Sequence, residues 1–426
     1  KYFGENFKLK ISKLCKEMVK ENLNAILISK SSQICWLLNL RGRDLKFSPL
    51  IQSFAIILSD KSIHLFVSDK SKLNIDHNLV SIYNISSLKG FIKQLNVLKI
   101  SLKLEKTPFI IYEVLKQKNV KLITNFNFLE EFCSIKSKNE LSFIRKVHIR
   151  DGAALVKFLI WLKSNIANKL KINEFQAAQK LKTIRSEDEK FNSESFPTIS
   201  ASSQNSAIVH YKPTQKINHL IKRENLFLID SGGQYLDGTT DITRTVSFQS
   251  QNYNIKKIYT RVLQSHIALA SAVFPDRIKG KELDIISRYN LWKHGLDYNH
   301  GTGHGVGYFL EVHETPPSIS RNSNNQIKKG MLISNEPGYY KEGGFGIRIE
   351  NLMIVDDYKI VDGINYLKFE TISLCPFENT LIINNLLTKV EKKWINNYYS
   401  KVRKKISPHL TSYEKNWLYK NTEKIV

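Results

Sequence analysis

The hydrophobic positions in the first third of the chain switch between helical and strand-like spacing. Residues 6–20 carry Phe7, Ile11, Leu14 and Met18 at intervals of three or four, which predicts an amphipathic helix. Short apolar runs with polar flanks follow, and these predict strands of a mixed sheet: 25–28, 35–40, 54–58 and 63–67. We therefore expect an α/β domain in this part of the chain.

The rest of the chain combines long helical patterns with short strands. A polar segment at 133–140 breaks the pattern and predicts a domain boundary. Beyond it, apolar side chains at helical spacing predict helices over four ranges: 140–167, 173–185, 252–274 and 281–293. Strands are predicted at 331–334 and 346–355, and residues 196–210 predict two strands joined by a Ser/Asn/Gln turn. This order predicts an α+β domain with antiparallel pairing.

Two carboxylates are expected to meet at one end of a hairpin. The apolar run 226–229 predicts a buried strand that leads into Asp230, and two glycines after it supply a turn signal. Residues 242–248 alternate as a returning strand does, and they begin directly after Asp241. Antiparallel pairing of the two runs would bring Asp230 and Asp241 close together.

Three more residues with metal-ligand chemistry follow in short motifs. His304 lies in HGTGHGVG, Glu336 in SNEPGYY and Glu350 in GIRIEN. With Asp230 and Asp241 they make four carboxylates and one imidazole, a set that suits Mn²⁺, Fe²⁺, Co²⁺ or Zn²⁺. A single catalytic ion normally takes about three protein ligands and a water. Five side chains therefore predict two ions that share carboxylates.

Five segments resemble the metal-binding and active-site segments of aminopeptidase P, an X-Pro aminopeptidase of the pita-bread metallopeptidase family: 230–245, 300–307, 311–314, 335–340 and 346–351. The resemblance implies that Asp230 binds one metal ion and that His304 and Glu336 bind the other. It implies that Asp241 and Glu350 bridge both ions. The implied cofactor is a pair of divalent cations, Mn²⁺ in the first place, with Zn²⁺, Co²⁺ or Fe²⁺ as alternatives.

The resemblance also implies roles for residues beyond the metal ligands. His210, in AIVHYKP, resembles a family histidine that contacts the substrate and the tetrahedral intermediate. His300 and His313 resemble the two other active-site histidines of the family. Tyr340 and Arg348, together with His300, fall where the family lines the pocket for the proline ring.

The implied activity is removal of the N-terminal residue from peptides with proline in second position, by a hydroxide that two metal ions activate. The bond cleaved is a tertiary amide whose nitrogen lacks a hydrogen. That nitrogen must gain a proton to leave, and Glu336 and the nearby histidines are the candidate acids. Two other functions stay open: a prolidase, which shares the metal set, and a non-catalytic pita-bread binding module, in which ligands are lost. The large N-terminal domain disfavours a methionine aminopeptidase.

Taken singly, each motif has an ordinary structural explanation. DGTTD is typical of a turn with capping residues, and NEPG is typical of a plain turn. GTGHGVG looks like a phosphate loop, but no clear strand precedes it and no helical pattern follows it. The prediction of a metal site therefore depends on the conjunction of all five ligand-type residues in matching segments.

The resemblance divides the chain into three parts. Residues 1–136 resemble the creatinase-type α/β middle domain of the three-domain form, and 137–372 resemble the pita-bread catalytic domain. Residues 373–426 resemble a C-terminal extension that contributes to dimer contacts. The first domain of the long form and an initiator Met are absent, naturally or by trimming. We expect a homodimer, and the alternative use of four aromatic residues in the extension is packing on their own domain: Trp394, Tyr398, Tyr399 and Trp417.

Composition narrows the partners and the compartment. Lys and Arg number 64 against 39 Asp and Glu, which gives a net charge of +25. The lysines are scattered in a chain rich in Lys, Asn and Ile, so we expect no specific nucleic-acid partner and no membrane partner. Four dispersed cysteines, with no Cys-x-x-Cys pair, indicate reduced thiols and predict a cytoplasmic protein.

Overall fold

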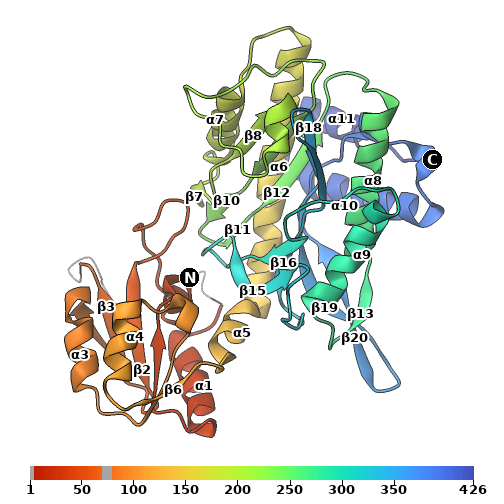
Figure 1. Ribbon diagram of the computed structural model, residues 1–426. Helices are drawn as coiled ribbons and strands as arrows, with labels where there is room; N and C mark the ends of the chain where they lie inside the picture. The colour runs from red at the N-terminus through yellow and green to blue at the C-terminus, as the bar shows by residue number, and fades with distance from the viewer. Residues whose placement is uncertain (1–3, 70–78) are drawn as a thin grey trace. The chain divides into compact units, whose positions relative to one another are not determined.

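The structure is a computed structural model that describes residues 4–69 and 79–426. The chain forms two compact units that divide between Cys133 and Ser134 (Figure 1). The first unit is an α/β domain, and the second combines long helices with several small sheets. The expected α+β class with a smaller α/β domain in front is confirmed.

The first unit is built on a six-stranded mixed sheet in the order β4-β3-β2-β1-β5-β6. β1 is antiparallel to β2 and parallel to β5. The strands are β1 (Ala25–Ile28), β2 (Ser53–Leu58), β3 (Ile63–Val67), β4 (Val80–Asn84), β5 (Lys99–Ser101) and β6 (Lys121–Ile123). The helices are α1 (Phe7–Lys20), α2 (Ser31–Leu37), α3 (Leu88–Gln94), α4 (Phe109–Lys116) and α5 (Phe128–Ser134).

The apolar side chains of the strands and helices of the first unit meet in one core. Leu27, Ile56 and Phe66 on the strands pack in one cluster with Ile92 and Val114 on the helices. Burial of each such side chain stabilises the fold by about 1.5–3 kcal/mol. The expected helix at 6–20 is confirmed as α1, whose Asn6 side chain caps the first turn.

The expected strand at 35–40 is wrong. The first half of that run, through Leu37, belongs to α2, and every residue of α2 after Ser31 is buried. A helix that is buried on all sides shows no polar face. A short apolar run of this kind does not distinguish a helix from a strand by its periodicity.

The second unit starts with a long helix, α6 (Lys138–Ala167). Ser137 begins it as a capping box, because the Ser137 N–H donates to Glu140 Oε2 at 2.8 Å and the Glu140 N–H donates to Ser137 Oγ at 3.3 Å. The other helices are α7 (Glu174–Arg185), α8 (Tyr253–Ala270), α9 (Gly280–Trp292), α10 (Lys389–Ile406) and α11 (Ser412–Lys420). All four helices expected between 140 and 293 are confirmed, with ends that differ from the prediction by at most four residues. In the described part of the chain, no helix has the length and apolar character needed to span a membrane.

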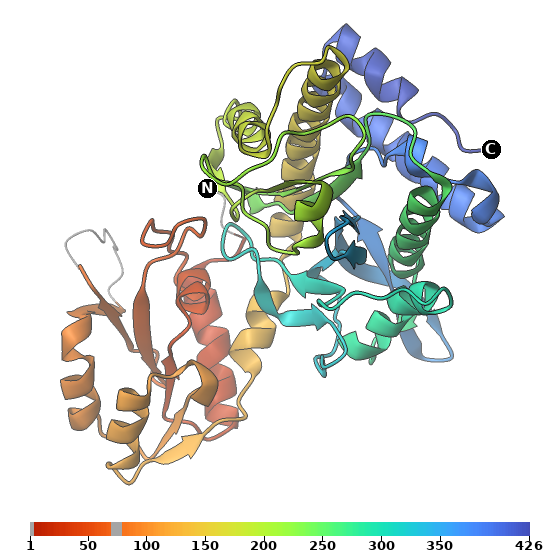
Figure 2. The same cartoon turned by 45° about the horizontal axis from the view of Figure 1, so that its top comes forward.

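Small sheets fill the space between these helices (Figure 2). Their orders are β12-β9-β8, β11-β10-β7, β17-β18 and β13-β20-β19-β16-β14-β15. The first strands are β7 (Phe191–Glu194), β8 (Ile199–Ser202), β9 (Phe227–Ser231), β10 (Gly233–Tyr235), β11 (Gly238–Thr239), β12 (Ile242–Val246) and β13 (Val273–Pro275). The others are β14 (Gly303–Gly305), β15 (Glu314–Ile319), β16 (Leu332–Asn335), β17 (Gly338–Lys341), β18 (Phe345–Arg348), β19 (Asn351–Val361) and β20 (Ile364–Thr371).

The region 196–246 is only partly as expected. β9 and β12 pair antiparallel, which confirms the main hairpin, but the glycines lead into a second small hairpin, β10 and β11, rather than a tight turn. β8 forms within 196–210, but the second strand expected there does not. Residues Ser203–Ala207 form a 3₁₀ helix, η4, instead.

The C-terminal tail packs on its own unit. α10 and α11 lie beside α6 in both views (Figures 1 and 2). Tyr398 and Tyr399 are buried in the same core cluster as Phe158 of α6, and Trp394 and Trp417 pack partly buried against it. Of the two uses expected for these aromatics, the structure shows core packing.

Candidate metal centre

Asp230 and Asp241 come from the same end of one antiparallel strand pair. β9 pairs with β12 in the register that sets Asp230 opposite Thr243, and Asp241 directly precedes β12. Gly232 lets this end close tightly, since a Cβ there would lie 1.9 Å from the carbonyl oxygen of Thr240. The register therefore brings the two carboxylates to the same end of this strand pair.

His304 and Glu336 come from neighbouring strands of the six-stranded sheet. His304 lies in β14, and Glu336 directly follows β16, which pairs with β14. The Ser334 hydroxyl joins them, because it accepts from the His304 N–H at 2.9 Å and donates to Glu336 Oε1 at 3.1 Å. One serine thus orients two of the expected ligands.

Glu350 lies in the link between β18 and β19 and is almost fully buried. Its N–H donates to the Thr243 carbonyl oxygen at 3.2 Å, and its Oε2 accepts from Thr243 Oγ1 at 2.7 Å. Thr243 is therefore both the register partner of Asp230 and the group that aims Glu350. The roles of Thr243 and Ser334 could not be predicted from the sequence, because a hydroxyl inside a strand carries no motif of its own.

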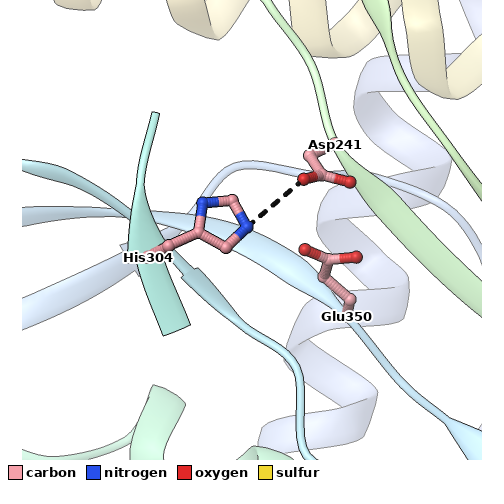
Figure 3. Close-up of side chains that lie close together, drawn as sticks. All are labelled: Asp241, His304 and Glu350. Atoms are coloured by element: carbon pink, nitrogen blue, oxygen red, sulfur yellow. Dashed lines mark ion pairs between the residues drawn. The ribbon is translucent and has the colours of Figure 1, made fainter. Parts of the chain in front are cut away.

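Asp241, His304 and Glu350 point toward one another (Figure 3), and one ligand atom from each lies within 4.8 Å of the others. His304 Nε2 is 3.5 Å from Asp241 Oδ2 and 3.4 Å from Glu336 Oε1. His304 Nδ1 is 2.9 Å from the Gly305 carbonyl oxygen, which can only accept, so Nδ1 carries the hydrogen. The lone pair is then on Nε2 and faces the carboxylates, as a metal-binding imidazole requires.

Three carboxylate oxygens of the expected ligands are buried and accept no hydrogen bond from the protein: Asp230 Oδ1, Asp241 Oδ1 and Glu350 Oε1. Burial, reinforced by the facing carboxylates, holds the pKa values of Asp241 and Glu350 well above the usual range of a carboxyl. Unpaired buried oxygens of this kind are costly unless a cation offsets them. The donor set therefore fits divalent cations.

Arg348 is a buried cation next to Asp230. Its Nη2 donates to Asp230 Oδ2 at 2.7 Å, and its Nη1 donates to Tyr340 Oη at 2.8 Å. Tyr340 Oη lies 2.8 Å from His300 Nε2, and His300 Nδ1 lies 2.8 Å from the Gly301 carbonyl oxygen. Burial, and then the Arg348 charge, lower the pKa of His300 to about 3. His300 is therefore a neutral imidazole that accepts the Tyr340 hydroxyl hydrogen.

A pocket of about 340 Å³ opens onto the carboxylates. All five expected metal ligands line it, together with Arg348, His210, His313 and Lys212, and its apolar wall consists of Phe196, Pro197, Ile199 and Val209. His300 and Tyr340 are not part of the lining and reach the pocket through Arg348. The structure thus gathers eight of the ten expected site residues around one pocket and connects the other two to it.

His210 and His313, the two histidines that line the pocket beside His304, are exposed. The His313 ring packs edge-on against the His304 ring, with centroids 4.2 Å apart. Desolvation inside the pocket, followed by the neighbouring His304 and His210 rings, lowers the pKa of His313. A neutral imidazole still donates through one N–H, so His313 can offer a hydrogen bond to a bound carbonyl oxygen.

Three family models match successive stretches of the chain. The model of metallopeptidase family M24 matches residues 142–357, the creatinase/prolidase N-terminal domain matches 1–140, and the C-terminal region of peptidase M24 matches 365–425. The chain belongs to metallopeptidase family M24. The expected pita-bread architecture with a creatinase-type domain in front is confirmed.

Individual relatives narrow the resemblance. A probable Xaa-Pro aminopeptidase P of Laccaria bicolor is 39% identical over 425 residues, which cover 96% of this chain and 66% of that protein. The crystal structure of an X-prolyl aminopeptidase from Caenorhabditis elegans, a cytosolic enzyme with a di-nuclear active site, matches with a TM-score of 0.93 at 32% identity over 100% of this chain and 72% of that one.

A prolidase from Pyrococcus horikoshii OT3 is less similar, with a TM-score of 0.67 and 27% identity over 87% of this chain and 99% of that one. This chain spans about two thirds of the length of the fungal relative. The predicted resemblance to aminopeptidase P is confirmed, and the chain is an M24 metallopeptidase of the Xaa-Pro aminopeptidase type.

Proposed function

We propose that this chain removes the N-terminal residue from peptides with proline in second position, with the help of two divalent cations. The observation that carries the proposal is the cluster of Asp241, His304 and Glu350, whose ligand atoms lie within 4.8 Å of one another and in which each carboxylate keeps one buried oxygen that accepts no hydrogen bond. The di-nuclear site of the nematode relative supports the number of ions. The similarity to Xaa-Pro aminopeptidases supports the substrate class.

The proposed ligands are Asp230 for one ion, His304 and Glu336 for the other, and Asp241 and Glu350 for both. Four carboxylates match the charge of two dications, and an oxygen-rich set with one nitrogen favours Mn²⁺ over softer ions. Bound there, the ions supply Lewis-acid activation of a water and of the scissile carbonyl. Arg348 keeps one oxygen of Asp230 engaged and leaves the other for an ion.

The protein groups around the ions hold the substrate and move its protons. The free amino terminus of a peptide binds in the pocket beside the metal centre, which limits cleavage to the first residue. His210 and His313 offer N–H donors to the oxygen of the scissile carbonyl, a contribution of about 10²–10³ in rate for such a donor. Glu336 accepts a proton from the attacking water through its carboxylate and passes it to the leaving proline nitrogen.

His300, Tyr340 and Arg348 form the wall for the proline ring in this proposal. Of the three, Arg348 lines the pocket, and the hydrogen-bond chain through Tyr340 to His300 fixes the direction of its guanidinium group. Arg348 has its cationic nitrogens committed to Asp230 and Tyr340. A ring without an N–H suits such a wall, because it leaves no donor unpaired.

We also propose a cytoplasmic homodimer organised as domains 1–136, 137–372 and 373–426. Four dispersed, buried cysteines with no Cys-x-x-Cys pair support a reducing compartment, as does the cytosolic nematode relative. Val390 on α10 and Tyr413 on α11 are exposed apolar side chains of the tail and support a contact there. Sedimentation equilibrium at several protein concentrations tests the dimer.

The experiment that tests the function is hydrolysis of Arg-Pro-Pro by the purified chain, first freed of metal with a chelator and then supplied with Mn²⁺. We expect release of free arginine only after Mn²⁺ is added, and none from Arg-Ala-Pro. A panel of Xaa-Pro dipeptides and longer Xaa-Pro peptides separates the alternatives. Cleavage of dipeptides alone would indicate a prolidase, and metal binding without any cleavage would indicate a binding module.

A further inference from the structure

A buried carboxylate outside the metal centre holds the segment of residues 203–219, which contains His210. Glu174 is the first residue of α7, and its side chain is fully buried. Its two oxygens accept hydrogen bonds from four residues on this segment or at its border: Ser202, Asn205, Tyr211 and His219. An ionised acceptor makes such hydrogen bonds about twice as strong as neutral ones.

The two backbone donors lie at the ends of the segment 203–219. The Ser202 N–H donates to Glu174 Oε1 at 2.6 Å, and the His219 N–H donates to Glu174 Oε2 at 2.7 Å. Between them the only regular element is η4, and the rest of the segment is irregular. Because the segment has little backbone pairing of its own, its path depends on these contacts.

Tyr211 brings the same carboxylate next to His210. Tyr211 Oη donates to Glu174 Oε2 at 2.8 Å, and the Tyr211 side chain is buried. His210, one residue earlier, is exposed and lines the pocket at the metal centre. Fixing the Tyr211 ring therefore fixes the backbone from which the His210 ring reaches the substrate.

The other side of the segment rests on β18. The Gly346 N–H donates to Ser206 Oγ at 2.7 Å, and a Cβ at Gly346 would lie 1.8 Å from the Ser206 carbonyl oxygen. Arg348 Nη2 approaches the Val209 carbonyl oxygen at 3.5 Å. The segment is thus held between Glu174 on one side and the strand that carries Arg348 on the other.

We propose that Glu174 and Tyr211 are positioning residues, which hold the His210 ring where it can donate a hydrogen bond to the scissile carbonyl oxygen. The inference rests on the proposed role of His210 in the reaction. Neither Glu174 nor Tyr211 touches the substrate, so both act only through the placement of the His210 ring. A misplacement of about 1 Å is enough to lower a rate by about a hundredfold.

The variant Tyr211→Phe tests this, because it keeps the buried ring and removes one of the hydrogen bonds to Glu174. We expect kcat for Arg-Pro-Pro with saturating Mn²⁺ to fall by about ten- to a hundredfold, with KM and the number of bound Mn²⁺ ions nearly unchanged. The matched control is Tyr399→Phe, which removes a hydroxyl that bonds Asn379 from an equally buried tyrosine in the tail core. It should leave kcat as it is.

A double-mutant cycle separates positioning from general support of the fold. In a His210→Ala background, Tyr211→Phe should cause no further loss of kcat, since the group that it positions is gone. An equal loss in both backgrounds, or an unchanged kcat in Tyr211→Phe alone, would overturn the inference. If His210→Ala itself is fully active, the proposed role of His210 is wrong and the inference falls with it. An impaired His210→Ala beside a fully active Tyr211→Phe rejects the positioning role alone.

Glu174→Gln extends the test to the carboxylate. Glutamine replaces one acceptor oxygen by a donor that faces the N–H or O–H of its former partners, so we expect a larger fall in kcat than for Tyr211→Phe. This fall should also shrink in the His210→Ala background. Should Glu174→Gln fail to fold, the Tyr211→Phe cycle still decides the question.

Discussion

At the scale of single residues, two carboxylates of the site each use one oxygen for a hydrogen bond with the protein and leave the other oxygen unpaired. Asp230 engages Arg348 with Oδ2 and leaves Oδ1 unpaired, and Glu350 engages Thr243 with Oε2 and leaves Oε1 unpaired. In each case the paired oxygen orients the group, and the other is left for a cation. The motifs predicted which residues supply donors, since residue type decides ligand chemistry. They singled out Arg348 only for the proline pocket and did not single out Thr243, because the contacts by which these two residues orient Asp230 and Glu350 are made by the fold.

The first prediction concerns the single nitrogen of the donor set. His304→Ala should reduce the number of Mn²⁺ ions bound per chain from two to one and lower kcat below detection, because one ion loses its imidazole. Isothermal titration with Mn²⁺ and the Arg-Pro-Pro assay measure the two effects. His294→Ala, at an exposed histidine, is the control and should bind two ions. Two tight sites in His304→Ala would contradict the assignment.

The second prediction concerns pH and a histidine that is not a ligand. His266 Nδ1 donates to the Asn335 carbonyl oxygen and Nε2 accepts from the Asn351 amide, and burial, followed by the Arg244 charge, lowers the pKa of His266 to about 3. An unfolded histidine has a pKa of about 6.5. The unfolded state therefore binds the proton first, and stability is lost as the pH falls through about 6.5 toward 3.

One such proton corresponds to about 1.4 kcal/mol per pH unit. Urea unfolding at pH 7.5, 6.0 and 5.0 measures the free energy of unfolding. As the pH is lowered, this free energy should therefore decrease less steeply in His266→Gln than in the unaltered protein. His409→Gln, at an exposed histidine, should keep the original slope. Equal slopes in all three proteins would mean that His266 is not held neutral by the fold.

At the scale of elements, the register of β9 and β12 does most to assemble the site. It sets Thr243 opposite Asp230, and the Thr243 side chain then bonds Glu350 from a distant part of the chain. The apolar run 226–229 and the alternation over 242–248 predicted that these two strands pair. The register matters because a slip of one residue would turn every side chain of a strand to the other face. The second of the two strands predicted within 196–210 does not form, since the sequence does not reveal that polar groups of this region bond Glu174 rather than a neighbouring strand.

The third prediction tests that register through one hydroxyl. Thr243→Val keeps the shape of the side chain and removes the donor to Glu350 Oε2, so the affinity for Mn²⁺ should fall by about 10–100-fold, as for other partners that orient metal ligands. Titration with Mn²⁺ measures it. Thr260→Val removes a buried hydroxyl in α8 that bonds the Lys256 carbonyl oxygen and should leave the affinity unchanged. An equal affinity in Thr243→Val would show that Glu350 needs no such support.

At the scale of the whole molecule, the tail and the metal centre share one core. Arg244 of β12 joins them, because its buried guanidinium donates to the carbonyl oxygens of Glu350 and Cys375 and to the Tyr398 hydroxyl of α10. It also lies 4.8 Å from the Phe377 ring centroid. These partners lie more than a hundred positions from Arg244 along the chain, so no local sequence pattern could have predicted the link.

The fourth prediction follows from this link. Arg244→Lys keeps the charge but cannot reach all of the acceptors, so the free energy of unfolding should fall by about 3 kcal/mol. The affinity for Mn²⁺ should weaken as well, since Arg244 also holds the Thr243 carbonyl oxygen. Arg145→Lys, at a half-exposed pair with Glu370, should change stability by about 0–1 kcal/mol. Urea unfolding compares them, and an unshifted midpoint in Arg244→Lys would contradict the coupling.

The measurement that tests the central claim most directly is the anomalous scattering of manganese in crystals of the protein grown with Mn²⁺. We predict two peaks in the pocket, one coordinated by Asp230 and the other by His304 and Glu336, with Asp241 and Glu350 in contact with both. A single peak, or manganese bound away from these five residues, would contradict the account of the site as a two-ion hydrolytic centre.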